Sequence, residues 1–591
     1  MFDESPKREG LGHGDDGGPR RHTAGETRMS VGLGKALPPA VRAAAREELD
    51  PEGTARRAAA EPETAGTAAP HGAGDERAGG LSRRQLLRTG GALGASLLAA
   101  QMTRGTTAAR AAGNRPNVVV VGAGLAGVTA AYRLAQVGIP VNLYEASDRV
   151  GGRCFTARGF SGGQTAEHGG EFVDTRHVHL IKLAQELGLT LEDFFDAQGN
   201  PPGWPAYIGG TWYPEDAWDP DFDRLTRAII KQARAIGAVS NGAIDPTAYS
   251  YGTATPAARQ LDQLSMTDWL DQRLPGTTGS PFGKLLERIA GSGIGLPMSG
   301  SSAINWMDLL GPDDADERYH IRGGNDQVPT LAAAALPRGA LHMNAPLQRL
   351  SRRNDGRYEL RFGGIGATVL ADRVVLALPY STLRDVDLSC AGLSPHRMSV
   401  IQQLSMGTNG KLLLRYDDRP QAHTYALGQW TGFSLDYGAA RHTWDSTRRQ
   451  PGNGSITTMF YGGQGAPAWA GRPAHAGASG AFVANAVSHL DATVPGTGAH
   501  FTGEAWIDAW VNDPWVRGSY SAYGIGQYTA NEGFNYRAEG AIHFAGEHTS
   551  TYSRAYLNGG VESGQRAAIE IMNKAGVPVP ANIANLPYSG S

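Results

Sequence analysis

The chain has 591 residues and a formal charge of −3, from 54 basic and 57 acidic side chains, so it offers no electrostatic basis for binding nucleic acid. Its 81 glycines follow no collagen-like period, and its two cysteines are too few for a disulfide framework or a cysteine-rich metal site. No run of 18 strongly apolar residues is present. We therefore expect no membrane span and no metal centre.

Residues 1–113 lack the hydrophobic periodicity of a folded domain and are expected to be a disordered leader. Within them, Arg83 and Arg84 precede a mildly apolar run at Gly90–Ala100 and then the small-residue stretch Ala109-Arg110-Ala111. This order is typical of a twin-arginine export signal. It predicts a secreted or extracytoplasmic protein, with a disordered basic linker as the alternative.

The segment 117–145 has the pattern of a βαβ unit. Asn117–Val121 is a β-branched apolar run, as expected of a buried parallel strand. A G-x-G-x-x-G motif follows at 122–127 and opens a helical pattern that ends at Gly138. Pro140–Glu145 is a second strand that ends in an acidic residue. This context predicts a dinucleotide-binding unit.

Each motif residue has a physical role in such a unit. Gly122 permits the tight turn, Gly124 lets the backbone approach a pyrophosphate, and Gly127 lets the helix pack closely on the strand. The helix N-terminus presents free N–H groups to the phosphates. Glu145 is placed to accept hydrogen bonds from ribose hydroxyls.

The sequence from Gly122 to Thr156, GAGLAGVTAAYRLAQVGIPVNLYEASDRVGGRCFT, closely resembles the opening of flavin-containing amine oxidases. The resemblance continues in EHGGEF at 167–172, YHIRGGND at 319–326, IHFAGE at 542–547 and NGGVESGQRAA at 558–568. It covers roughly residues 115–575 and implies an FAD cofactor.

The family resemblance implies an α/β fold: a discontinuous, Rossmann-like FAD-binding domain and a substrate domain with a mixed sheet and helices. We expect segments 115–205, 316–396 and 500–576 in the cofactor domain, 206–315 and 397–499 in the substrate domain, and a tail at 577–591. The implied cofactor-binding residues are Gly122, Gly124, Leu125, Ala126, Gly127, Glu145, Ala146, Arg153, Gly169, Gly170, Glu171, Gly546, Glu547 and Val561.

Three residues match positions that bear on the reaction in this family. Lys411 matches a lysine that holds a water against flavin N5. Tyr520 and Tyr556 match an aromatic pair that orients the amine nitrogen. Ser519 precedes Tyr520 where monoamine oxidases can carry a cysteine bonded to FAD. Serine forms no thioether, so non-covalent FAD is expected.

The implied reaction is oxidation of a small amine. Hydride passes to FAD, the imine is hydrolysed to a carbonyl and ammonia or a smaller amine, and dioxygen reoxidises the flavin to give hydrogen peroxide. Alternatives are an L-amino acid oxidase, a carbon–carbon dehydrogenase and a non-catalytic FAD-binding carrier. The specific amine and the oligomeric state, a homodimer included, stay open.

One position departs from the amino-acid-specific branch of this family. L-amino acid oxidases often carry an arginine just after the Gly-Gly position, where it binds the substrate carboxylate. Glu171 and Phe172 occupy that stretch here. A carboxylate would repel an amino acid's carboxylate and could attract a second amine, which favours an amine over an amino acid.

Overall fold

The computed structural model describes residues 115–588, except 197, 200–201, 241, 311–315, 367, 437–441 and 464–468. The predicted leader and twin-arginine signal at 1–113 lie outside the described residues, as do 589–591 of the predicted tail. Among the described residues, no helix combines the length and apolarity needed to cross a membrane.

A five-stranded parallel sheet forms from segments far apart in the sequence. Its order is β11 (Leu341–His342), β2 (Val141–Tyr144), β1 (Val118–Val121), β15 (Arg373–Leu376) and β27 (Ile542–Phe544). Every residue of β1 is buried, because layers of the fold cover both faces of the sheet. This sheet confirms the predicted α/β class.

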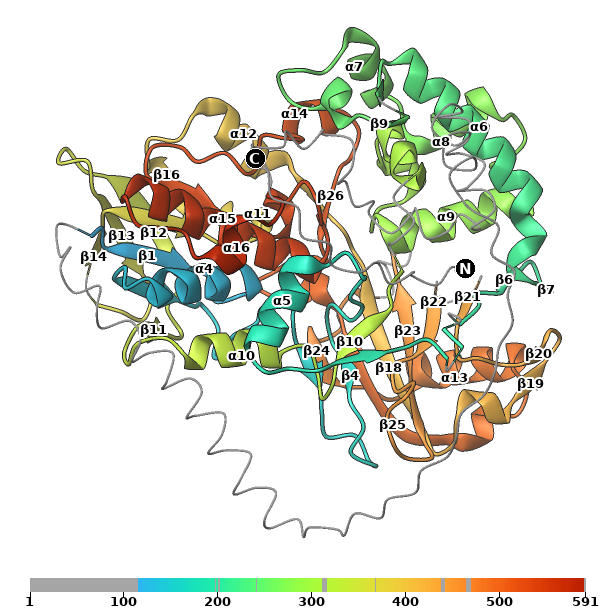
Figure 1. Cartoon of the computed structure of the whole chain (residues 1–591). Coiled ribbons are helices and arrows are strands. Elements are labelled where there is room, and N and C mark those ends of the chain that lie inside the picture. Colours follow the sequence, from blue (N-terminus) through green and yellow to red (C-terminus); the bar gives the residue numbers. More distant parts are fainter. Residues whose placement is uncertain are drawn as a thin grey trace, which may run out of the picture. The chain divides into compact units, whose positions relative to one another are not determined.

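Two helices pack against this sheet and against each other, α4 (Leu125–Gln136) and α15 (Leu557–Lys574). Figure 1 shows them side by side in blue and red. Glycine makes the close approach possible: a Cβ on Gly564 would lie 2.2 Å from the Ala126 carbonyl oxygen. A Cβ on Gly127 would lie 1.8 Å from the Gly122 oxygen, so Gly127 serves the packing predicted for it.

The second large sheet has eight strands and is mixed. Its order is β24 (His475–Gly477), β25 (Phe501–Asp508), β18 (Gly410–Tyr416), β23 (Ser455–Tyr461), β22 (His442–Asp445), β21 (Ser434–Asp436), β6 (Ala206–Ile208) and β7 (Thr211–Tyr213). All neighbours are antiparallel except β21 and β6. Strand β25 belongs to this sheet, although it lies within the range 500–576 expected for the cofactor domain.

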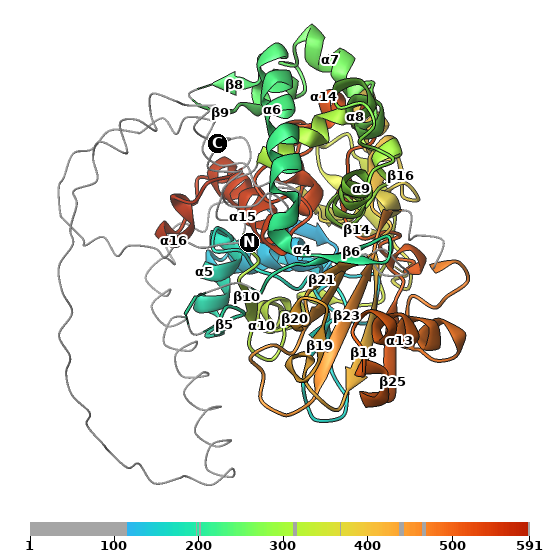
Figure 2. The ribbon, with the colours of Figure 1, turned by 90° about the vertical axis from the view of Figure 1, so that its right-hand side faces the viewer.

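The strand β18 is buried along its whole length because both faces are covered. Leu412 and Leu414 pack in one cluster with side chains of α13 (Ala481–Thr493), and Leu413 packs in another with Ala157 and Ala166. Figure 2 shows α13 beside β18 and β25. Lys411 shares the face of Leu413, because alternate residues of a strand point the same way.

A four-stranded sheet and further helices complete the described chain. The sheet has the order β14 (Thr368–Ala371), β13 (Tyr358–Phe362), β12 (Leu347–Arg352) and β16 (Asp387–Cys390). The helices are α5 (Val178–Glu186), α6 (Asp219–Ala235), α7 (Pro256–Asp262), α8 (Met266–Arg273), α9 (Pro281–Gly293), α10 (Gln327–Ala334), α11 (Tyr380–Leu383), α12 (Pro395–Gln403), α14 (Tyr528–Asn531) and α16 (Ala581–Ala584). Short pairs are β3 (Thr156–Ala157) with β4 (Ala166–Glu167), β5 (Leu191–Asp193) with β10 (Tyr319–Ile321), β8 (Val239–Ser240) with β9 (Ala243–Ile244), β17 (Ser405–Met406) with β26 (Ser521–Ala522), and β19 (Thr424–Tyr425) with β20 (Gly428–Gln429).

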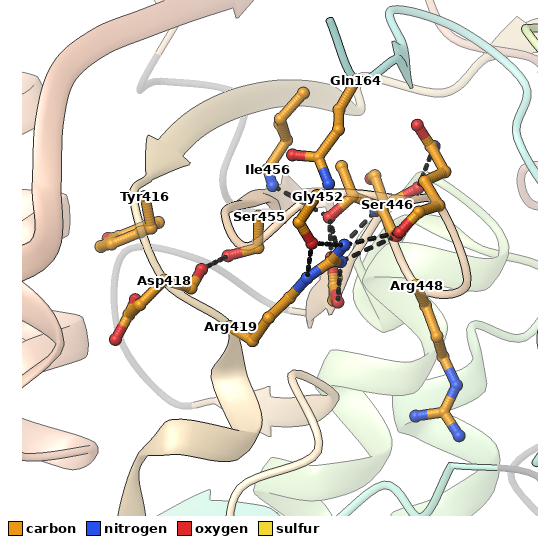
Figure 3. Close-up of polar contacts among 12 residues, drawn as sticks. Gln164, Tyr416, Asp418, Arg419, Ser446, Arg448, Gly452, Ser455 and Ile456 are labelled. Carbon is orange, nitrogen blue, oxygen red and sulfur yellow. Dashed lines mark hydrogen bonds and ion pairs between the residues drawn. The ribbon is translucent and has the colours of Figure 1, made fainter. Parts of the chain in front are cut away.

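Arg419, which follows β18 in the chain, holds the connection between β22 and β23 by hydrogen bonds. Its guanidinium donates to the carbonyl oxygens of Thr447 (3.0 Å), Gln450 (2.6 Å) and Gly452 (2.7 Å). Figure 3 shows this guanidinium at the centre of the polar contacts. These hydrogen bonds hold the connection between β22 and β23 against the segment that follows β18.

The C-terminal tail packs on the fold in its described part. The Tyr588 hydroxyl donates to the Ile583 carbonyl oxygen at 2.8 Å, and His179 Nε2 lies 2.7 Å from the Pro587 oxygen. Residues 577–588 therefore contribute to the surface that covers α5.

Candidate active site

A groove of about 580 Å³ runs along the carboxyl ends of β1 and β2. Ten of the predicted cofactor residues line it: Gly122, Gly124, Leu125, Ala126, Glu145, Ala146, Arg153, Gly170, Gly546 and Glu547. Gly169 and Glu171 line an adjacent cavity instead, together with Gly170. Gly127 and Val561 do not line the groove and lie within helices α4 and α15.

The groove has the features that FAD requires. A Cβ on Gly124 would meet no protein atom within 4 Å, so this glycine keeps open space at the surface of the groove. The residues just before helices α4 and α15, Gly124 and Tyr556, both line the groove, and neither N-terminus is capped by a side chain. Their free N–H groups suit a pyrophosphate and the polar edge of a flavin.

Two carboxylates of the groove, Glu145 and Glu547, are held in place by the hydrogen bonds that they accept. Glu145 accepts from the Ala123 amide at 2.6 Å and the Ser147 amide at 2.9 Å, which holds it at the end of β2. Glu547 accepts from Arg153 Nη1 at 2.8 Å and from the Ser521 hydroxyl at 2.7 Å. Burial alone would raise the pKa of Glu547, but the charge of Arg153 and these hydrogen bonds lower it to about 2.

The adjacent cavity has a volume of about 220 Å³ and meets the groove at Ser519, Tyr520 and Tyr556. Its walls are mostly aromatic and aliphatic: Phe172, Trp204, Ile289, Leu435, Trp444, Phe460, Trp510 and Leu557. A cavity of this kind excludes water and suits the hydrocarbon part of a small molecule.

One row of cross-strand neighbours supplies the polar side of the site. In strand order the row is His475, Asp508, Lys411, Phe460, His442 and Leu435. Four of these residues line the cavity and His475 lines the groove. Because directly opposed residues of neighbouring strands point to the same face, the register of this sheet brings them together.

Lys411 is held by a buried ion pair. Its Nζ lies 2.8 Å from Glu171 Oε2 and 2.8 Å from the Glu167 carbonyl oxygen. The Lys411 and Glu171 side chains are 5% and 3% exposed, which makes the pair nearly inaccessible to bulk water. The other carboxylate oxygen of Glu171, Oε1, is buried without a hydrogen-bond partner. Glu171 lines the cavity, and its Oε1, like Asn409 Oδ1, is an acceptor that the protein leaves unsatisfied.

The predicted tyrosines both lie at the junction of cavity and groove. The Tyr520 hydroxyl donates to the Ser292 carbonyl oxygen and accepts from Asn409, which fixes its ring. Tyr556 precedes the first residue of α15, and its ring centroid lies 5.0 Å from that of His177. Ser519, next to Tyr520, lines the same junction.

Sequence reasoning assigned no function to several residues of the site. His168, Trp444, His442 and His475 line the cavity or the groove, and buried Asp508 bridges His168 and His475. His168 lies in the EHGGEF motif, whereas the other four side chains come from strands without a recognisable motif. The single signal for His475, Asp508 and His442 is the register of the eight-stranded sheet.

The comparisons with known proteins agree with this geometry. Residues 125–572 match the family model of the flavin-containing amine oxidoreductases. A flavin-dependent L-tryptophan oxidase of Lentzea aerocolonigenes is 26% identical over 465 residues, which are 76% of this chain and 96% of that protein. A putrescine oxidase of Kocuria rosea is 28% identical over 283 residues, 44% of this chain and 56% of that protein.

Solved structures resemble this fold as well. Putrescine oxidase bound to putrescine has a TM-score of 0.65 at 22% identity, and covers 78% of this chain and 99% of its own. Cyclohexylamine oxidase from Brevibacterium oxydans has a TM-score of 0.65 at 23% identity, with 78% and 100% covered. The fold, the groove and the family match together confirm the predictions of an FAD cofactor and of amine oxidation. The chain belongs to the flavin-containing amine oxidoreductase family and is an FAD-dependent amine-oxidising enzyme.

Proposed function

We propose that this enzyme oxidises a primary amine that has no carboxylate on its amine carbon, with dioxygen as acceptor and hydrogen peroxide as product. The observation that carries the proposal is Glu171, a carboxylate that lines the cavity and whose Oε1 is buried without a hydrogen-bond partner. A buried unsatisfied acceptor is costly, by about 1–3 kcal/mol, and an N–H donor of a bound amine removes that penalty. A substrate carboxylate at the same place would face a like charge.

The cationic residues of the cavity favour an amine over an amino acid as the substrate. Arg153 is the one arginine among the described residues that line it, and Arg153 is bound to Glu547 and to the Ser519 carbonyl oxygen. Lys411 is already paired with Glu171. Neither cation is thus free to bind a substrate carboxylate. Arg441, next to His442 of the cavity wall, lies outside the described residues.

The chain's residues would bind and orient the amine beside the cofactor. When bound, FAD supplies the acceptor for hydride. Tyr520 and Tyr556 would flank the amine nitrogen, and Glu171 would accept one of its N–H groups. Lys411 would provide positive charge for the reaction with dioxygen. The serine at position 519 supports a non-covalent flavin, so acid precipitation should release the yellow cofactor into solution.

A peroxide assay with matched substrate pairs tests this function. Each pair consists of an amine and the amino acid that carries one additional carboxylate: tryptamine with L-tryptophan, and putrescine with L-ornithine. We expect peroxide and ammonia from at least one amine, with kcat/KM at least tenfold above that of its amino acid. A preference for the amino acids would establish the L-amino acid oxidase alternative. No peroxide from any amine or amino acid would contradict dioxygen as the acceptor.

We also propose export by the twin-arginine pathway, supported by Arg83 and Arg84 before the apolar run at 90–100. This pathway carries folded proteins, which suits an enzyme that binds FAD before export. Replacing both arginines with lysine should leave active enzyme inside the cell, measured as peroxide formation in separated cell and culture fractions. Unchanged extracellular activity would contradict the signal, and removal of residues 1–80 is the control.

A further inference from the structure

A line of four hydrogen-bonded groups leads from the cavity to the groove. Asp508 is fully buried on β25 and lies between two histidines. Its Oδ2 is 2.9 Å from His168 Nδ1, and its Oδ1 is 2.7 Å from His475 Nδ1. His475 Nε2 is in turn 3.1 Å from Asp513 Oδ2. Carboxylates and imidazoles therefore alternate along one continuous line.

The two ends of the line lie in different spaces. His168 lines the cavity, and since Asp508 engages its Nδ1, Nε2 is the ring nitrogen left for a ligand. His475 and Asp513 line the groove. Asp513 accepts from the amide of Trp515, whose side chain is 42% exposed. The line thus begins at the cavity and ends in the groove at Asp513, next to the exposed Trp515.

Aromatic rings enclose the middle of the line. The Phe155 ring lies 4.3 Å from His168 and 5.9 Å from His475, measured between centroids. Trp506 lies 5.2 Å from His168, and its Nε1 donates to Asp508 Oδ1 at 3.2 Å. Apart from the Trp506 N–H, these walls contribute apolar ring surface, so the imidazoles and carboxylates are the groups along this path that can pass on a proton.

The charged residues packed around the line form hydrogen bonds or ion pairs with residues outside it. Arg149 lies with its guanidinium 4.0 Å from the Phe155 centroid and donates to the Gly152 carbonyl oxygen. Lys411 is a register neighbour of Asp508 and is paired with Glu171. Glu167, the residue before His168, accepts from the Thr156 hydroxyl at 2.9 Å and the Asn325 amide at 2.8 Å.

Burial alone would lower the pKa of His475, but its hydrogen bonds to Asp508 and Asp513 raise it above the ordinary value. The imidazole therefore holds a proton readily although it is enclosed. Asp513 shows the complementary effect: burial would raise its pKa, and the hydrogen bond to His475 lowers it.

We propose that the line His168–Asp508–His475–Asp513 carries the proton of the bound ammonium out of the cavity. The inference rests on the proposed function, since an amine arrives as an ammonium ion at neutral pH and only the neutral amine can release hydride. The ammonium N–H bond breaks, its electron pair stays on nitrogen, and a new N–H bond forms at His168 Nε2. His168 releases its Nδ1 proton to Asp508, which passes it to the unprotonated Nδ1 of His475 in its neutral Nε2–H form. His475 then releases its Nε2 proton to Asp513. One proton leaves the cavity and no oxidant is consumed.

Proton release on binding of tert-butylamine tests the line without turnover, because this amine has no C–H bond on its amine carbon. The FAD-loaded enzyme is mixed with it in weak buffer, and a pH-indicator dye reports the proton. We expect wild type to release about one proton per ligand, and Asp508→Asn to release it at least tenfold more slowly. Asp262→Asn is the matched control, because Asp262 is equally buried and lies in a separate network with Ser302 and Thr529.

A pH profile separates proton transfer from structural damage. Near pH 10 much of the substrate amine arrives neutral, so Asp508→Asn should recover the wild-type rate of flavin reduction that it lacks at pH 7. A defect that persists equally at all pH values would overturn the proposal, as would wild-type proton release in Asp508→Asn. His475→Gln interrupts the line one step further out, at a more exposed side chain, and should give the same result. Failure of the proposed function is seen separately, as absence of peroxide with every amine.

Discussion

The groove and the cavity are built by different means. The groove depends on backbone geometry at glycines and on the N-termini of two helices, all close to motifs in the sequence. The cavity depends on side chains that a six-strand register brings together from residues 411 to 508. Backbone geometry suits a cofactor of fixed shape. In the cavity, by contrast, a single side-chain substitution can alter which substrate is bound or how fast it reacts.

If the groove depends on backbone geometry, the substitution with the largest expected effect is at Gly124. A Cβ there would meet no protein atom within 4 Å, and the branched carbons of a valine would take up space in the groove, so the chain should fold and lose FAD. Absorbance at 450 nm gives the flavin content, and circular dichroism gives the fold. We expect flavin occupancy near zero with a wild-type far-ultraviolet spectrum.

Gly127→Val is the matched contrast within the same motif. Its Cβ would lie 1.8 Å from the Gly122 oxygen, so this variant should fail to fold rather than only lose the cofactor. If Gly124→Val kept its FAD, or if both variants behaved alike, the groove would not be the cofactor site described here.

The second prediction concerns Lys411, on the cavity side of the comparison. Preorganised charge in a dry site contributes roughly 3–4 kcal/mol to steps that develop opposite charge. Lys411→Met should therefore slow reoxidation by dioxygen by about 100-fold, and anaerobic reduction by substrate far less. Stopped-flow absorbance measures the two half-reactions separately. Equal slowing of both would assign Lys411 a structural role.

Glu171→Gln should change reoxidation in the opposite direction, because Glu171 neutralises Lys411 at 2.8 Å. Without that negative charge the lysine's field is uncompensated, so reoxidation should be at least as fast as in wild type. Amine binding should weaken, since the acceptor loses its charge. Slower reoxidation in this variant would show that Glu171 serves to position Lys411.

The sequence predicts the groove far better than the cavity, and the reason is physical. Gly122, Gly124 and Glu145 lie within one βαβ unit, so local spacing sets their geometry. Lys411 was predicted from its motif, but its ion pair with Glu171 was not, because the two residues are 240 positions apart. Asp508 carries no local signal at all. Its role depends on β25 pairing with β18 and β24, an order that the chain sequence does not reveal.

The third prediction concerns how the free energy of unfolding depends on acid pH through Glu547, which forms an ion pair with Arg153. The pKa of this carboxyl falls from 4.5 to about 2, so the charged form stabilises the fold. That contribution, roughly 3 kcal/mol, is complete above pH 4.5 and is lost as the pH falls toward 2. Urea unfolding between pH 6 and pH 3 should show a shallower loss of stability in Glu547→Gln. Glu504→Gln, at a half-buried carboxylate that accepts from the Ser161 amide, is the control.

The smallest effect is expected at Tyr556, where cavity and groove meet. Its ring lines both spaces and packs against His177, whereas its neighbour Ala555 donates its amide to Glu547. An aromatic face that orients an amine contributes about 0.5–1.5 kcal/mol. Tyr556→Ala should therefore slow anaerobic flavin reduction by about tenfold or less, with flavin content unchanged, and Tyr556→Phe should stay near wild type because it keeps the ring. Loss of flavin in Tyr556→Ala would place this ring on the cofactor side of the junction. A wild-type reduction rate would show that it only packs against His177.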